Sequence, residues 1–123
     1  MDQILVEGIK LFGYHGCLDE EGLIGTDYRV DVCVWGDLRL PAENDQLRDT
    51  LDYVIINRIV TAEMAVRAKL IEHVAKRIID RILREMPAVA EVEIKLSKLH
   101  PPINGDVESV SVVMKRKRTE NTN

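Results

Sequence analysis

This chain of 123 residues has few aromatic residues and no strong charge of one sign. One Trp, three Tyr and one Phe make up only 4% of it, so a large aromatic core is not expected. The formal net charge is −4, from 17 basic and 21 acidic residues, which argues against a nucleic-acid-binding protein. No stretch of about 18 uncharged apolar residues occurs, so we expect no membrane span.

Cysteine is also scarce. Cys17 and Cys33 stand far apart and form no CxxC pair, so neither a disulfide framework nor a zinc ribbon is expected. Reduced thiols in a cytoplasmic protein are the simpler interpretation. The chain opens with Asp2 instead of a basic region, and no long apolar run follows, so we expect no secretory signal.

The remaining composition is that of an ordinary globular protein, with 46% hydrophobic and 31% charged residues. A chain of this length favours one domain with a single core. The polar run KRKRTENTN that closes the sequence is expected to fray. We place the domain at residues 1–118 and a frayed tail at 119–123.

Alternation of apolar and polar residues predicts two strands in the first third of the chain. Residues 3–14 form the first, and their apolar parity changes near Glu7 and Gly8, which indicates a β-bulge. Residues 28–38 alternate more cleanly and predict a half-buried strand. The segment HGCLDEEGLIG between them is too polar and glycine-rich for a tight hairpin turn, and residues 41–50 form a second connection.

Helical periodicity follows. Residues 53–66 predict a helix with Asp52 as its N-cap. An unbroken apolar stripe from Leu70 to Met86 predicts a second, which Pro87 ends because the residue before proline resists helical angles.

Two further strands are indicated by alternation in the last third of the chain. Their apolar positions are Val92, Ile94 and Leu96 in one strand and Val110, Val112 and Met114 in the other. The order strand-strand-helix-helix-strand-strand predicts an α+β fold, ββααββ, with two helices on one face of a sheet.

Lys98 departs from this pattern, because it continues the apolar parity of its strand. Such a lysine either extends to water along the sheet or occupies a pocket, where burial would suit it to acid or base chemistry. Spacing alone leaves both interpretations open.

Glu72 stands in the first turn of the second helix, where the electropositive helix N-terminus favours a carboxylate. It is either a surface residue or a carboxylate that accepts two parallel N–H donors from a planar ligand. Glu21 belongs to an acidic run in a loop, and Tyr53 begins a helix; neither pattern by itself indicates chemistry.

A metal site and a phosphate-binding loop are not predicted. His15, His73 and His100 show none of the usual zinc-ligand spacings. The glycines are scattered, and GYHG matches neither a P-loop nor a dinucleotide fingerprint.

Taken together, several segments resemble the dihydroneopterin aldolase family along almost the whole chain. No single segment is specific, but their order and distances are. The segments are GYHG at 13–16, Glu21 and Gly25 in the following loop, DTLDY at 49–53, LIEHVAKRI at 70–78 and KLHPPING at 98–105.

The resemblance implies the tunnelling fold (T-fold), with an antiparallel sheet, and a ring-forming homo-oligomer, usually an octamer of two stacked tetrameric rings. It implies a lyase of folate biosynthesis that acts on a small pterin, without metal, bound cofactor or Schiff base. The substrate would be 7,8-dihydroneopterin, and the products 6-hydroxymethyl-7,8-dihydropterin and glycolaldehyde.

The resemblance also implies roles for single residues. Lys98 matches the catalytic lysine, and Tyr53 matches a catalytic tyrosine supplied by a neighbouring subunit. Glu72 matches the glutamate that anchors the pterin ring, with Ile71 offering backbone contacts beside it. Glu21 matches the loop glutamate near the substrate side chain.

Two departures and two alternatives remain. Thr26 stands where family members often have Gln, and the connection RAKLIEH lacks the polar or small residues often seen before the anchor; both bear on substrate affinity. An epimerase of dihydroneopterin triphosphate shares the fold, and a non-catalytic ring-forming relative would keep it without the chemistry. The YHG and KLHPP motifs, and the presence of all the site residues, favour the aldolase.

Overall fold

The computed structural model describes residues 1–118, and these form a four-stranded sheet with helices. In chain order the elements are β1 (Asp2–Gly13), α1 (Asp19–Ile24), β2 (Thr26–Gly36), α2 (Arg39–Asn44), a 3-10 turn (Leu47–Asp49), α3 (Tyr53–Met64), α4 (Ile71–Glu85), β3 (Glu91–Leu99) and β4 (Ser109–Lys117). The predicted ββααββ order is confirmed, with short helices added in the two connections.

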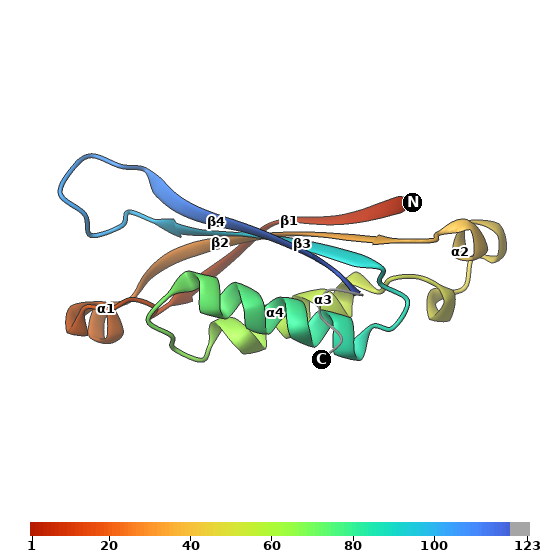
Figure 1. Ribbon diagram of the computed structural model, residues 1–123, viewed down its shortest axis with the longest axis horizontal. Coiled ribbons are helices and arrows are strands. Elements are labelled where there is room, and N and C mark those ends of the chain that lie inside the picture. The colour runs from red at the N-terminus through yellow and green to blue at the C-terminus, as the bar shows by residue number, and fades with distance from the viewer. Residues whose placement is uncertain (119–123) are drawn as a thin grey trace.

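The sheet has the strand order β1-β2-β3-β4, and all neighbours pair antiparallel. Helices α3 and α4 lie side by side against one face of it (Figure 1). The connection that contains α1 lies at one end of the sheet, and the connection that contains α2 lies at the other. This two-layer arrangement is the α+β architecture that the sequence predicts.

The β-bulge in β1 is confirmed. Val6 pairs with Val32, but the next paired residue, Ile9, faces Val30, so the register shifts between them. Gly8 has a φ of 70°, a conformation that glycine adopts without steric cost, and its N–H donates to the Asp31 carboxylate over 2.7 Å. The shift turns apolar residues from both halves of β1 towards the helices.

The core between sheet and helices is aliphatic. Inward positions of β2 and β3 alternate with outward ones, and the apolar stripe of α4 packs on them. The stripe is fully buried from Val74 to Ile82, whereas Leu70 at the N-cap of α4 is 52% exposed. Asp52 caps α3 as predicted, since its side chain accepts a hydrogen bond from the Val54 N–H.

Both connections that the sequence predicts as loops contain short helical turns. Helices α1 and α2 have six residues each, too few to be stable alone, and neither buries a residue completely. Tertiary contacts stabilise α1, as described below.

The C-terminal run begins inside the fold, so the prediction that it frays from Lys115 is wrong. Residues 115–117 belong to β4, and Arg118 follows directly. The Arg118 guanidinium donates to the carbonyl oxygens of Leu83, Met86 and Val89, at and just beyond the end of α4. The Leu83 carbonyl has no helical partner, because Pro87 four residues later has no N–H, and the Met86 carbonyl accepts only from the Val89 N–H besides Arg118 among the described residues. The Arg118 side chain therefore completes the hydrogen bonding of this helix end. Residues 119–123, the predicted tail, lie outside the described residues, and the domain boundary at 118 stays a prediction.

None of the helices within residues 1–118 is long and apolar enough to cross a membrane.

We expect Arg118→Ala to lower the free energy of unfolding by about 2 kcal/mol, because charged hydrogen bonds to the helix-end carbonyls are lost. Denaturant unfolding at fixed protein concentration measures it. Arg116→Ala is the matched control, since that guanidinium donates only to the carbonyl of its neighbour Lys115 among the described residues. Equal losses in both variants would contradict the capping role of Arg118.

Candidate active site

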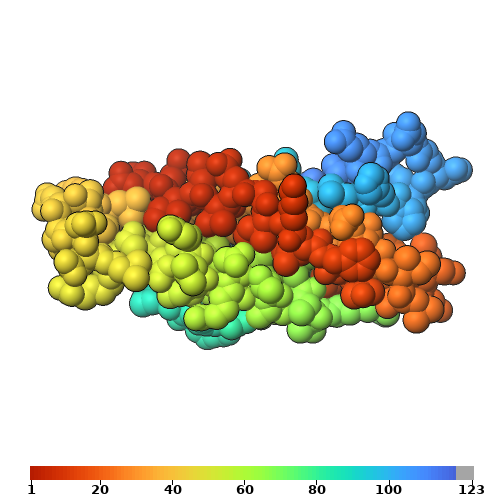
Figure 2. Space-filling model, turned by 180° about the vertical axis from the view of Figure 1, so that it is seen from behind, coloured from red at the N-terminus to blue at the C-terminus, as the bar shows by residue number. Residues whose placement is uncertain are grey.

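The candidate site lies at the end of the sheet where β3 ends. Lys98, near the end of β3, pairs with Tyr28 near the start of β2, and the lysine is only 9% exposed. Two connections reach the same end: the one that contains α1, and the one between α3 and α4 (Figure 1). Figure 2 shows the β3–β4 connection, in blue, projecting at this end above the orange segment around α1.

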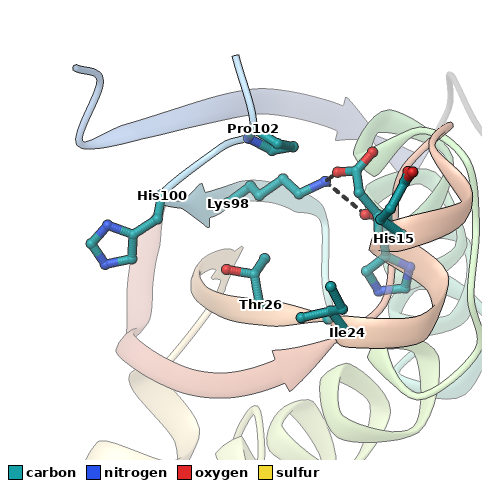
Figure 3. Close-up of a pocket in the computed structure, with 9 residues that line it drawn as sticks. His15, Ile24, Thr26, Lys98, His100 and Pro102 are labelled. Carbon is teal, nitrogen blue, oxygen red and sulfur yellow. Dashed lines mark hydrogen bonds and ion pairs between the residues drawn. The ribbon is translucent and has the colours of Figure 1, made fainter. Parts of the chain in front are cut away.

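Among residues 1–118, the Lys98 ammonium has two partners. Nζ donates a 2.6 Å hydrogen bond to the carbonyl oxygen of His15 and forms an ion pair with the Glu21 carboxylate (Figure 3). An ammonium has three N–H donors, so one stays available for a ligand. The pocket interpretation of Lys98 is therefore the correct one, and extension to bulk water is excluded.

Glu21 is held in place by α1. Its carboxylate also accepts a hydrogen bond from the Leu18 N–H, 3.2 Å away. Burial alone would raise the pKa of Glu21, but the hydrogen bonds from Lys98 and Leu18 and the charges of Lys98 and Arg67 outweigh it, so the pKa is lowered. Gly16, with a φ of 150°, passes so close to this carboxylate that a Cβ there would clash with it.

The connection between α3 and α4 binds the loop before α1. Arg67 donates to the carbonyl oxygens of Tyr14, Gly16 and Leu18. The Gly16 N–H donates to the carbonyl of Ala68. These contacts order α1 and Glu21 relative to the start of α4. No residue pattern reveals them beforehand, because their acceptors are backbone carbonyls.

Two hollows lie on either side of the Lys98–Glu21 pair. The smaller, of about 160 Å³, is partly enclosed and appears in Figure 3; it includes His15, Ile24, Thr26, His100 and Pro102. The larger, of about 350 Å³, is an open groove, and it contains both Ile71 and Glu72. The rest of its lining is Gly16, Cys17, Leu18, Lys69, Leu70, Pro101, Pro102, Ile103 and Val110.

Glu72 stands in the first turn of α4, as predicted, and opens onto the groove. The first N–H groups of a helix have no helical partner, and the helix dipole is positive there. The groove therefore offers a carboxylate, the positive end of a helix dipole and the Lys98 ammonium, a set suited to a polar planar ligand with donors along one edge.

Tyr53 lies elsewhere. It begins α3 next to Leu51, which packs against Gly36 at the far end of β2 from Tyr28. At about 3.3 Å per strand residue, the two ends of this stretch are roughly 26 Å apart. One chain thus brings together Lys98, Glu21, Glu72 and Ile71, but not Tyr53, whose side chain is exposed.

Among residues 1–118, no three His, Cys, Asp or Glu side chains are grouped so that they could hold a metal ion.

The chain has the tunnelling fold, which it shares with enzymes of known structure. A uricase from Bacillus fastidious matches 98% of this chain and 45% of its own with a TM-score of 0.73, at 13% identity, which shows the fold alone. An Escherichia coli dihydroneopterin aldolase, solved in complex with neopterin, matches 94% of this chain and 99% of its own, with a TM-score of 0.84 and 27% identity.

Sequence comparison gives the family. The model of the dihydroneopterin aldolase family matches residues 4–115. The dihydroneopterin aldolase of Bacillus subtilis is 33% identical over 97% of this chain and all of its own, and that of Streptococcus pyogenes serotype M1 is 32% identical over 96% and 100%. The chain belongs to the dihydroneopterin aldolase family.

The ion pair predicts how stability changes with pH. Because its pKa is lowered in the folded protein, the ionised Glu21 carboxylate stabilises the fold at pH values above its ordinary pKa of 4.5. This contribution is lost as the pH falls through the lowered pKa. We therefore expect Glu21→Gln to be less stable than the parent at pH 7, with a difference that shrinks below pH 4.5.

Urea unfolding at a series of pH values, at fixed protein concentration, measures this difference. Glu20→Gln, one position earlier on α1, is the control, because the Lys98 ion pair is with Glu21 and not with Glu20. A Glu21→Gln difference that stays constant from pH 7 downwards would show that the carboxylate charge does not stabilise the fold.

Proposed function

We propose that this protein is a 7,8-dihydroneopterin aldolase of folate biosynthesis, which cleaves its substrate to 6-hydroxymethyl-7,8-dihydropterin and glycolaldehyde. The observation that supports it most is the buried Lys98 ammonium, which retains a free donor beside the groove that Glu72 opens onto. Membership of the family makes the pterin the first substrate to test.

Retro-aldol cleavage needs an electron sink beside the bond that breaks. Dihydroneopterin carries its own, the imine between C6 and N5 of the ring, so the enzyme has only to move protons. Neither a metal ion nor a Schiff base on Lys98 is required. Lys98 would protonate N5 and remove the proton of the 2′-hydroxyl, through a water where the distance requires it.

Glu72 would bind the pterin ring. The 2-amino group and N3 of a pterin present two parallel N–H donors, and a carboxylate accepts both. Ile71 begins α4 and lines the same groove, so its backbone N–H, which has no partner within the helix, would be the donor beside Glu72. Glu21, paired with Lys98, would lie near the substrate side chain.

Tyr53 would come from a neighbouring subunit and reprotonate the intermediate at the exocyclic carbon. Its distance from Lys98 within one chain supports this assignment. Strands β1 and β4 form the two sheet edges, with 12 and 9 residues, and Val110 and Val113 of β4 are exposed. Pairing of such edges between subunits would cover them and close a ring, here an octamer of two tetrameric rings.

We expect Glu72→Gln to weaken pterin binding by about 1.5–3 kcal/mol, because an amide presents a donor to a ligand donor and the charge-assisted hydrogen bonds are lost. Calorimetry with 6-hydroxymethyl-7,8-dihydropterin measures it. Glu7→Gln, at the exposed bulge of β1, is the matched control. Unchanged affinity in Glu72→Gln would remove this residue from the pterin site.

Lys98 and Tyr53 should have separable effects on the products. Lys98→Met keeps the apolar part of the side chain but removes the proton donor, so we expect almost no cleavage with pterin binding retained. Tyr53→Phe removes one hydroxyl that acts after cleavage, so glycolaldehyde should still form while the hydroxymethyl product decreases. Chromatography of the products after incubation with 7,8-dihydroneopterin distinguishes these outcomes.

A mixing experiment tests whether the site is shared. Lys98→Met and Tyr53→Phe subunits, unfolded together and reassembled, should regain the normal product at about a quarter of the sites, since random assembly places an intact Lys98 beside an intact Tyr53 there. No recovery would contradict a site shared between subunits. If the wild-type protein yields only the C2′ epimer and no glycolaldehyde, the epimerase alternative holds.

A further inference from the structure

We propose that Tyr28 is a positioning residue for Lys98: its hydroxyl fixes the backbone carbonyl of His15, and this carbonyl aims the Lys98 amine at the groove. The inference deepens the proposed function and rests on it, because Lys98 is the proton-transfer group of that reaction.

The Tyr28 hydroxyl bridges both backbone polar groups of His15. It accepts a hydrogen bond from the His15 N–H over 3.1 Å and donates one to the His15 carbonyl over 2.9 Å. Tyr28 and His15 are each 1% exposed, so water does not replace these bonds. The orientation of this peptide segment therefore depends on one hydroxyl.

The same carbonyl is the acceptor for Lys98. A carbonyl oxygen has two lone pairs, and here Tyr28 takes one and the Lys98 ammonium takes the other at 2.6 Å. Tyr28 and Lys98 are direct partners across β2 and β3, and Nζ lies 5.9 Å from the centre of the Tyr28 ring. The Tyr28 ring lies beside the amine, and the Tyr28 hydroxyl fixes the carbonyl to which the amine donates, so both restrict the position of Nζ.

The protonation states favour this arrangement over a wide pH range. Burial, opposed in part by a backbone hydrogen bond and aided by the Glu21 charge, raises the pKa of Tyr28 to about 12, so the hydroxyl remains a donor. Burial lowers the pKa of His15 from its ordinary value, so the imidazole is neutral at pH 7. Its Nδ1 accepts a hydrogen bond from the Ala68 N–H at 3.0 Å, which anchors the residue from the other side.

The local sequence permits this packing. The His15 and Tyr28 rings meet edge to face, 5.3 Å apart at 71°. A Cβ at Gly13 would approach the Tyr28 ring to 3.0 Å, so glycine leaves the space that the ring occupies. Tyr28→Phe keeps the ring and its packing and removes only the hydroxyl, which makes it the informative variant.

We expect Tyr28→Phe to lower kcat on the order of tenfold, because small displacements of a catalytic group are costly. The KM for 7,8-dihydroneopterin should change little, since Glu72 binds the ring. If Tyr28 had only a structural role, Tyr28→Phe would lower the melting temperature, but kcat would not fall while KM stays unchanged. Two control variants are needed, and both should keep the parental kcat.

The first control is Tyr14→Phe, the same chemical change at an exposed tyrosine whose hydroxyl makes no hydrogen bond among the described residues. The second is Ile82→Val, which destabilises the core of α4 away from the site. A parental kcat in Tyr28→Phe, or an equal loss in Ile82→Val at a matched fall in melting temperature, would overturn the proposal.

An activity-independent measurement separates this inference from the proposed function. In the folded protein, acetylation of Lys98 by acetic anhydride, relative to exposed Lys10, should be several-fold faster in Tyr28→Phe, because the amine loses its fixed acceptor. Equal rates would contradict positioning even if turnover falls. If the wild-type protein does not cleave dihydroneopterin, the proposed function fails, and the labelling rates alone decide the role of Tyr28.

Discussion

Burial of the Lys98 ammonium is the constraint on which the rest of the site depends. A buried charge is costly unless it is paired and hydrogen-bonded, so a carbonyl and a carboxylate must be placed within reach of Nζ. His15 provides the first and Glu21 the second. Other residues hold these two partners in place. The Tyr28 hydroxyl donates to the His15 carbonyl, and Arg67 donates to the Leu18 carbonyl at the start of α1, the helix that carries Glu21.

The same constraint explains why the candidate site lies at one end of the sheet, away from Tyr53. The segments that satisfy Lys98 converge where β3 ends, and the start of α4 adds Glu72 to the groove. The start of α3, with Tyr53, lies towards the other end of the sheet, because the chain enters α3 from Leu51, which packs against Gly36 at the end of β2. On the proposed function, a second chain would place its own Tyr53 beside Lys98 of the first. Pairing of the two exposed sheet edges would allow such a contact.

Much of the fold could be predicted from the sequence because its signals are local. The parity change at Gly8 predicts the bulge, and the stripe along α4 and the alternation in β3 predict their elements to within a few residues. The helical turns α1 and α2 were missed because six-residue helices carry no periodic signal. The sequence predicts a frayed end that includes Arg118, because the partners of this residue are carbonyls brought near only by folding.

For the site, the sequence by itself determined which side chains are the candidates for the chemistry, since Lys98, Glu72, Glu21 and Tyr53 stand in motifs that resemble one family. Only the tertiary structure decided that Lys98 is buried and paired with Glu21, that Tyr53 is remote, and that Tyr28 and His15 stand behind the amine. The physical reason is that these contacts use backbone carbonyls and N–H groups. Every residue offers a carbonyl, so nothing in a residue's identity indicates which one a folded chain will use.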